Sequence, residues 1–192
     1  MSDAAWSAES PRTWKGQGLG LPPSGRGSLG AIGRRFAGAF LDGLILAPVA
    51  ILSLAFGSLH FVPLLASALY TVPLIARGQT LGQKALKLRV VALNDVTQGA
   101  DAPPPGLDVS VRRFLLPGGV GLIANFRGIA PAAAMLVQIA ALLNYLWALW
   151  DPNRQCLHDK IADVVVLATE GEMRTPPAWP PDQSPPQWPR QP

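Results

Sequence analysis

The stretch RRFAGAFLDGLILAPVAILSLAF, residues 34–56, decides the fold class of this chain. From Phe36 to Phe56 it is apolar except for Asp42, and a helix of about 20 apolar residues spans the hydrocarbon core of a bilayer. An ionised carboxylate in hydrocarbon costs at least roughly 2.5 to 3.5 kcal/mol, so such an acid usually serves a partner or a permeant. We therefore predict a membrane helix in which Asp42 has a functional or structural role.

Arg35 immediately precedes this run and lies seven positions before Asp42. Seven residues make nearly two helical turns, so both side chains lie on one face of the helix. The helix rise places Asp42 about 10 Å deeper than Arg35. The segment therefore predicts that Arg35 lies at the membrane interface and that Asp42 lies deeper in the bilayer.

The composition also indicates a membrane protein. The chain has 192 residues, of which 49% are hydrophobic and only 15% charged, whereas soluble proteins carry about 25% charged residues. The net charge of +4 comes from basic residues scattered through loops beside apolar runs. Contact with a lipid bilayer and its anionic headgroups explains this pattern, and we expect no nucleic-acid partner.

Few residues in the chain are typical of cofactor chemistry. Cys156 is the one cysteine, and the two histidines, His60 and His158, are far apart in sequence. The segment that follows Gly78 does not match a phosphate-binding loop, because Gln83 stands where that motif needs its second glycine. We expect no metal site and no bound cofactor.

Further apolar runs predict additional membrane segments. Residues 57–60 make a turn too short to cross anything, so Leu59 to Ala76 returns antiparallel to the first helix and completes a hairpin. Ile129 to Trp150 is long enough for another span and ends in interfacial aromatic residues. Leu115 to Ala124 is short and Gly-rich, so a thin span, a re-entrant segment and an interfacial helix remain alternatives.

The distribution of basic residues orients the hairpin. The 57–60 turn has no Lys or Arg, whereas basic residues flank the two hairpin ends: Arg34, Arg35, Arg77, Lys84, Lys87 and Arg89. The positive-inside rule then places the N-terminus and residues 77–112 in the cytoplasm. Arg154 and Lys160 favour a cytoplasmic C-terminus as well, which requires an even number of crossings. Three and four crossings both remain open.

We predict an all-α membrane protein with a helical hairpin, one or two further membrane segments and a cytoplasmic loop that contains a short strand, Leu88 to Leu93. Residues 1–30 are rich in Gly, Pro and Ser and are expected to form a disordered tail. Residues 31–168 form the transmembrane domain, and residues 169–192 form a second disordered tail rich in Pro and Trp.

Three blocks of sequence carry a resemblance to a known family. They are GRRFAGAFLD at residues 33–42, GQTLGQK at 78–84 followed by LRVV at 88–91, and DPNRQCLHDKIA at 151–162. In this order they resemble the RDD family of bacterial integral membrane proteins over roughly residues 30–168. The resemblance implies a multi-pass protein of the bacterial plasma membrane, and transport of unidentified ligands has been suggested for the family. It identifies Arg35 and Asp42 with the family's arginine and first aspartate, and either Asp151 or Asp159 with its second.

We expect the three blocks to meet at the cytoplasmic membrane surface. The expected charge cluster consists of Arg35, Asp42, Asp151, His158 and Asp159, and the expected loop residues are Gly78, Gln79, Thr80, Gly82 and Lys84. A long Arg side chain extends towards the interface, so Arg35 should pair with Asp151 or Asp159 more readily than with the deeper Asp42. The His158 segment has three alternative roles: a structural contact with residues 79–84, a proton or cation relay that includes Asp42, or a hydrolase metal site.

Three classes of function fit these features. A small transporter or channel component would use Asp42 beside a polar path, and with so few helices we expect it to form a homo-oligomer. In a structural or accessory membrane protein, the charged residues would only hold helices together. An intramembrane aspartyl enzyme needs two facing acids, whereas only Asp42 lies within a predicted span, so we expect no enzymatic activity.

Overall fold

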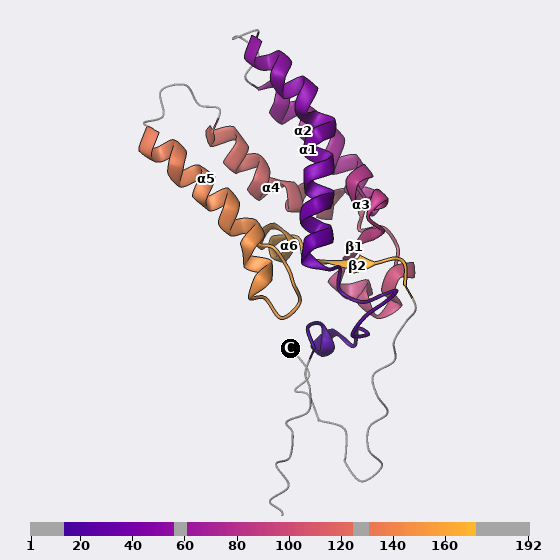
Figure 1. Ribbon diagram of the computed structural model, residues 1–192. Helices are drawn as coiled ribbons and strands as arrows, with labels where there is room; N and C mark the ends of the chain where they lie inside the picture. Colours follow the sequence, from indigo (N-terminus) through magenta and orange to yellow (C-terminus); the bar gives the residue numbers. More distant parts are fainter. Residues whose placement is uncertain (1–13, 56–60, 125–130, 172–192) are drawn as a thin grey trace, which may run out of the picture.

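The computed structural model describes residues 14–55, 61–124 and 131–171. Four long helices in this part of the chain stand on a small platform (Figure 1): α1 (Ile32–Ala55), α2 (Val62–Ala76), α4 (Gly106–Ala124) and α5 (Pro131–Leu146). The platform contains the strands β1 (Leu88–Ala92) and β2 (Val164–Ala168), the short helices α3 (Leu81–Ala85) and α6 (Leu157–Ile161), and the 3-10 helices η1 (Gln17–Leu19), η2 (Leu93–Asp101) and η3 (Trp147–Leu149). The expected 57–60 turn, with His60, lies outside the described residues.

Helix α1 contains the described segment that is long and apolar enough to cross a membrane, Ile32–Ser53. The apolar stretches Val62–Ala76 and Met135–Leu149 are shorter. Large apolar side chains of α1, including Phe40, Leu44 and Ile51, are exposed rather than packed against the rest of the chain. A long helix with an unburied apolar surface is typical of contact with lipid rather than with a protein core.

The four long helices form two hairpins that return to the platform. Helix α1 begins and α2 ends beside the platform, and α4 begins and α5 ends there as well (Figure 1). Helix α2 packs against both α1 and α4, and α4 packs against α5. The Leu115 to Ala124 run, which the sequence left open, is the second half of α4. Its first half carries Val109 and Ser110, which are buried.

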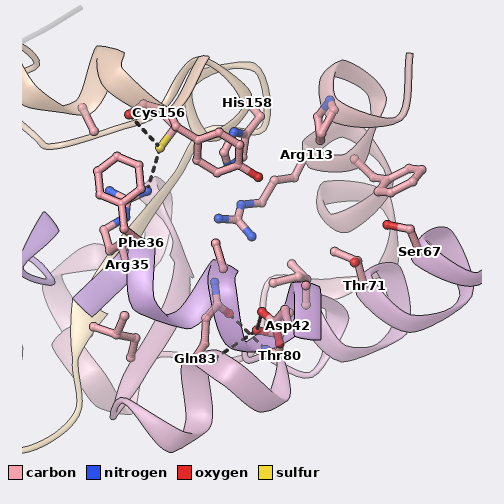
Figure 2. Close-up of a pocket in the computed structure, with 18 of the residues that line it drawn as sticks. Arg35, Phe36, Asp42, Ser67, Thr71, Thr80, Gln83, Arg113, Cys156 and His158 are labelled. Atoms are coloured by element: carbon pink, nitrogen blue, oxygen red, sulfur yellow. Dashed lines mark hydrogen bonds between the residues drawn. The ribbon is translucent and has the colours of Figure 1, made fainter. Parts of the chain in front are cut away.

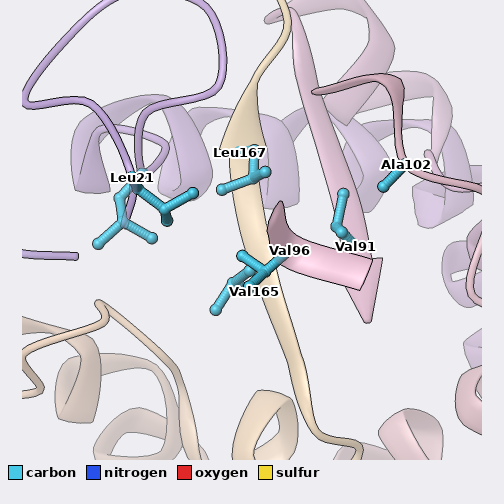
Figure 3. Close-up of a cluster of buried hydrophobic side chains, with 7 residues drawn as sticks. Leu21, Val91, Val96, Ala102, Val165 and Leu167 are labelled. Atoms are coloured by element: carbon cyan, nitrogen blue, oxygen red, sulfur yellow. The ribbon is translucent and has the colours of Figure 1, made fainter. Parts of the chain in front are cut away.

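A two-stranded antiparallel sheet forms the centre of the platform. Strand β1 pairs with β2 in the register Leu88↔Ala168 to Ala92↔Val164, and β2 was not expected from the sequence. One face of the sheet packs beneath the helices, and the other carries a buried apolar cluster (Figure 3) that consists of Leu21, Leu29, Val91, Val96, Ala102, Val165 and Leu167. Burial on both faces explains the continuous apolar run of β2.

The expected disorder of residues 1–30 is wrong for residues 14–30. Leu21 and Leu29 are buried against the sheet. The Gly30 N–H donates to the Val166 carbonyl at 2.8 Å, and the Leu29↔Leu167 bridge extends the sheet by one partner. These partners lie more than a hundred residues away in sequence, so local composition carried no sign of them. Residues 1–13 and 172–192 lie outside the described part of the chain.

Helix α3 lies unusually close to α1. Gly82 of α3 faces Gly38 of α1, and a Cβ atom added at Gly82 would collide with the Gly38 carbonyl oxygen and lie 2.9 Å from Oδ1 of Asp42. Because neither glycine has a side chain, the two backbones can approach this closely. The contact brings the platform directly against the first long helix.

Gly82→Ala is therefore expected to destabilise the protein. Overpacking of this kind typically costs about 1–3 kcal/mol. The matched control is Gly33→Ala in α1, where an added Cβ meets no heavy atom within 4 Å and helix propensity favours Ala by up to about 1 kcal/mol. Thermal unfolding of the purified protein in detergent measures both effects. Equal melting temperatures for the two variants would contradict the close approach of α3 and α1.

Candidate functional site

A cavity of about 260 Å³ lies where the long helices meet the platform (Figure 2). All three sequence blocks contribute to its wall. The polar and ionisable lining residues are Arg35, Asp42, Ser67, Thr71, Thr80, Gln83, Ser110, Arg113, Tyr145, Cys156 and His158. Of the residues that the sequence singled out, Arg35, Asp42, Thr80 and His158 line this cavity.

Asp42 is held by neutral hydrogen-bond donors. Its Oδ1 accepts from the Tyr70 hydroxyl at 2.6 Å and from the Gly82 N–H at 2.8 Å, and its Oδ2 accepts from the Thr80 hydroxyl at 2.6 Å. Hydrogen bonds to a charged group each contribute about 1.5–3 kcal/mol. Among the described residues, no Lys or Arg forms an ion pair with Asp42. This carboxylate therefore links α1 to α2 and to the start of α3.

The loop block positions these donors through a capping box. Thr80 is the N-cap of α3: its Oγ1 accepts from the Gln83 N–H at 3.2 Å, and Gln83 Oε1 accepts from the Thr80 N–H at 3.0 Å. This is the pairing that the Thr-x-x-Gln spacing favours. Gly78, with φ 97°, makes the turn that precedes it. The Gln79 N–H bonds the Leu74 carbonyl at the end of α2, and Lys84 is exposed.

Asp159 forms the second junction, and it is fully buried at 0% exposure. Its Oδ2 accepts from Arg35 and, at 3.1 Å, from the Cys156 N–H. Its Oδ1 accepts from Nε of Arg113 at 2.8 Å. Arg35 thus pairs with Asp159 and not with Asp42. Figure 2 shows Arg35 and Arg113 on the side of the cavity opposite Asp42.

Asp151, the other candidate for the second aspartate, has a different role. Its Oδ1 accepts from the N–H groups of Asn153 at 2.9 Å and Gln155 at 3.0 Å, and its Oδ2 pairs with Lys160 at 2.6 Å. These contacts shape the turn between η3 and α6. In the described part of the chain, no hydrogen bond or ion pair joins residues 151–163 to residues 79–84, so α1 and α4 hold this segment instead.

Burial and neighbouring charges control ionisation of the α6 block. Burial acts to raise the pKa of Asp159, but the positive charges of Arg113 and then Arg35 outweigh it and hold that pKa well below its ordinary value. Burial lowers the pKa of His158 to about 4, so its ring is neutral at neutral pH. Burial raises the pKa of the Cys156 thiol to about 12, so it remains protonated.

The ligand atoms of Cys156, His158 and Asp159 lie within 4.8 Å of one another, a grouping that the sequence did not predict. Both oxygens of Asp159 are already engaged by guanidinium groups. The positive charges of Arg35 and Arg113 also repel a metal cation. The chemistry of this donor set is that of an arginine–carboxylate cluster and does not favour a metal ion.

Arg113 and Tyr70 were missed as site residues by the sequence analysis. Arg113 is 9% exposed although it belongs to a pair of basic residues of the kind usually solvated. The available signal was helical spacing, because Val109, Ser110 and Arg113 share one face of α4 and are all buried. Tyr70 lay within an apolar run and carried no signal of its own.

The fold is that of a helical protein with a membrane-type helix, in which buried arginine–aspartate pairs attach the long helices to a small platform. The RDD family model matches residues 29–163. The chain belongs to the RDD family, a membrane-associated family, and the resemblance found in the sequence is confirmed. Comparisons with curated proteins and with solved structures found no match.

Asp159→Asn is expected to be strongly destabilising. The change leaves the guanidinium groups of Arg35 and Arg113 buried without a counter-charge, and breaking a buried ion pair costs about 3–5 kcal/mol. The control is Asp163→Asn, because the Asp163 side chain is 70% exposed and 3.7 Å from Arg112; exposed pairs contribute about 0–1 kcal/mol. Unfolding in detergent distinguishes the two variants. Similar losses would show that Asp159 does not hold the junction.

Proposed function

We propose that this protein is a multi-pass protein of the bacterial plasma membrane that carries a small ion or solute through the cavity beside Asp42. The observation that carries the proposal is the cavity itself, which has charged and hydroxyl side chains on its wall although the helices around it are apolar outside. Polar groups at membrane depth are costly and are typically retained for ligands or permeants.

The arrangement of the helices supports four crossings. Helix α1, with 24 residues, rises about 36 Å, which is enough for the roughly 30 Å of a hydrocarbon core. The apolar part of α4, residues 115–124, is shorter. Helices α2 and α5 are described over 15 and 16 residues, and a short span is accommodated by local thinning of the bilayer. Two hairpins that return to one platform support a topology in which the platform lies on a single side of the membrane.

Basic residues favour the cytoplasm as that side. Arg34, Arg77, Lys84 and Arg112 lie at or near the platform ends of the long helices and are exposed. They are suited to contact with anionic lipid headgroups, as the positive-inside rule and surface potential require. With so few helices the carrier is proposed to act as a homo-oligomer in the bilayer, without catalytic activity and without a nucleic-acid partner.

A structural or accessory role is the second candidate, and one observation favours it. Both buried carboxylates, Asp42 and Asp159, are already engaged by several donors within the protein. A carboxylate that coordinates a permeating cation usually keeps part of its coordination open. In this reading the two acids only attach the helices to the platform.

Cysteine labelling tests the orientation. Thr97→Cys, exposed in η2, should be protected from a membrane-impermeant maleimide in intact cells and should react after permeabilisation. Ser58→Cys, in the segment without Lys or Arg, should react in intact cells because the proposed topology places it outside. The wild-type chain is the background control, since Cys156 is buried. Labelling of Thr97→Cys in intact cells would reverse the proposed topology.

Flux assays in proteoliposomes test the transport proposal. Wild-type protein should carry at least one member of a panel of protons, Na⁺, K⁺ and small organic solutes. Asp42→Asn weakens the bonds that position Thr80 and α3 at the cavity wall, and the loss of one charge-assisted hydrogen bond corresponds to a decrease of about tenfold or more. Asp108→Asn, at a side chain 78% exposed, should have normal flux. A wild-type protein without flux for the whole panel would favour the accessory role.

A further inference from the structure

Arg113 presents unused hydrogen-bond donors to the cavity. Its Nε donates to Asp159 at 2.8 Å, and among the described residues its two terminal nitrogens have no hydrogen-bond partner. The residue is 9% exposed, and Figure 2 shows its guanidinium group pointing into the cavity. A buried guanidinium with free terminal nitrogens is costly unless a ligand or water meets them.

Arg35 provides a direct comparison on the same wall. Its terminal nitrogens are engaged within the protein, by the Arg154 carbonyl, Cys156 Sγ at 3.3 Å and Asp159 Oδ2. Arg35 therefore fastens α1 to the α6 block and has little left for a ligand. Arg113 bonds Asp159 through Nε, and its two terminal nitrogens are available to a ligand.

Two hydroxyl groups on α2 are also free. Ser67 and Thr71 line the cavity one helical turn apart, and in the part of the chain that the structure describes neither hydroxyl has a hydrogen-bond partner. This differs from Ser53 and Ser110, whose hydroxyls bond carbonyls of their own helices at 2.7 and 2.6 Å. The cavity thus combines the two terminal nitrogens of a guanidinium group with two hydroxyl groups, all of which lack hydrogen-bond partners among the described residues.

The charge around the fork favours an anion. Two buried guanidinium groups share the single negative charge of Asp159, so this junction retains one unit of positive charge. Asp42 lies on the opposite side of the cavity (Figure 2) and accepts hydrogen bonds from three neutral donors. A small cation at the fork would meet repulsion from Arg113, whereas a monoanion there would pair with the remaining positive charge of the arginine cluster.

We propose that the cavity binds a small monocarboxylate through the two terminal nitrogens of Arg113, with the rest of the solute directed towards Ser67 and Thr71. Guanidinium forks match carboxylates in a planar, bidentate geometry. The volume of about 260 Å³ is below the roughly 300–1,000 Å³ of pockets for drug-sized ligands, and Leu46, Phe114 and Pro117 supply apolar wall for a short alkyl chain. This inference rests on the proposed function, because it names the class of solute carried.

Binding to the full-length protein in a neutral detergent tests the inference. Sodium acetate, propionate and lactate are titrated by calorimetry against propionamide, the neutral isostere of propionate, at constant ionic strength. At least one carboxylate should bind, and propionamide should bind at least tenfold more weakly than propionate. Arg113→Gln should abolish binding, whereas Arg112→Gln, at an exposed neighbour on the same helix, should leave it unchanged.

Arg113→Gln also removes the bond to Asp159, so a second variant keeps the test informative if that protein does not fold. Ser67→Ala combined with Thr71→Val leaves the ion cluster intact and should weaken binding of lactate, which has a hydroxyl group, about three- to tenfold, as expected for lost neutral hydrogen bonds. Acetate and propionate have no such group and serve as controls. The inference is overturned if none of the three carboxylates binds, if propionamide binds as well as propionate, or if the folded variants bind lactate like the wild type.

The binding titrations and the flux assays together distinguish this inference from the transport proposal. Carboxylate binding in detergent, without flux of any solute in proteoliposomes, would support the site and overturn transport. Flux of protons or metal cations without carboxylate binding would support transport and overturn the site. Carboxylate-driven flux that is lost in Arg113→Gln would support both.

Discussion

The buried carboxylate of Asp159 is the interaction on which the arrangement of the domain depends. It receives Arg35 from the first long helix and Arg113 from the third, and it lies on a short helix that follows the fourth. Removing an ion from water costs several kcal/mol, and the attraction between partners offsets that cost only when the geometry and remaining hydrogen bonds are satisfied. The two helical hairpins are therefore fixed relative to each other by a cluster that is unfavourable unless all its members are present.

Asp42 makes a second junction by different chemistry. Its donors are two hydroxyls and a backbone N–H, so it joins α1 to α2 and α3 without a buried cation. The close approach of α3 is possible because Gly82 and Gly38 lack side chains. The two junctions lie on α1 at Arg35 and Asp42, and residues of both line the cavity.

Sequence patterns predicted the features that depend on neighbours along the chain. The apolar run around Asp42 marked α1, and the run Leu88 to Leu93 marked β1. The three blocks identified the family, and the preference of Arg35 for an aspartate of the last block followed from side-chain length. These inferences used helix rise, strand propensity and the length of the arginine side chain, all of which act over a few residues.

Tertiary structure decided the pairings between distant segments. Asp151 and Asp159 stand eight positions apart in one block, and only the orientation of α6 directs Asp159 to Arg35 and leaves Asp151 to its own turn and to Lys160. Arg113 resembled a solvated loop residue until the packing of α4 buried it, and Leu21 and Leu29 resembled parts of a tail until β2 supplied a surface for them. The sequence by itself thus determined the family, the first membrane-type helix and its unusual acid. The identity of the buried ion pairs and the polar wall of the cavity required the fold, because contacts between residues 38 to 124 positions apart leave no mark on local periodicity or composition.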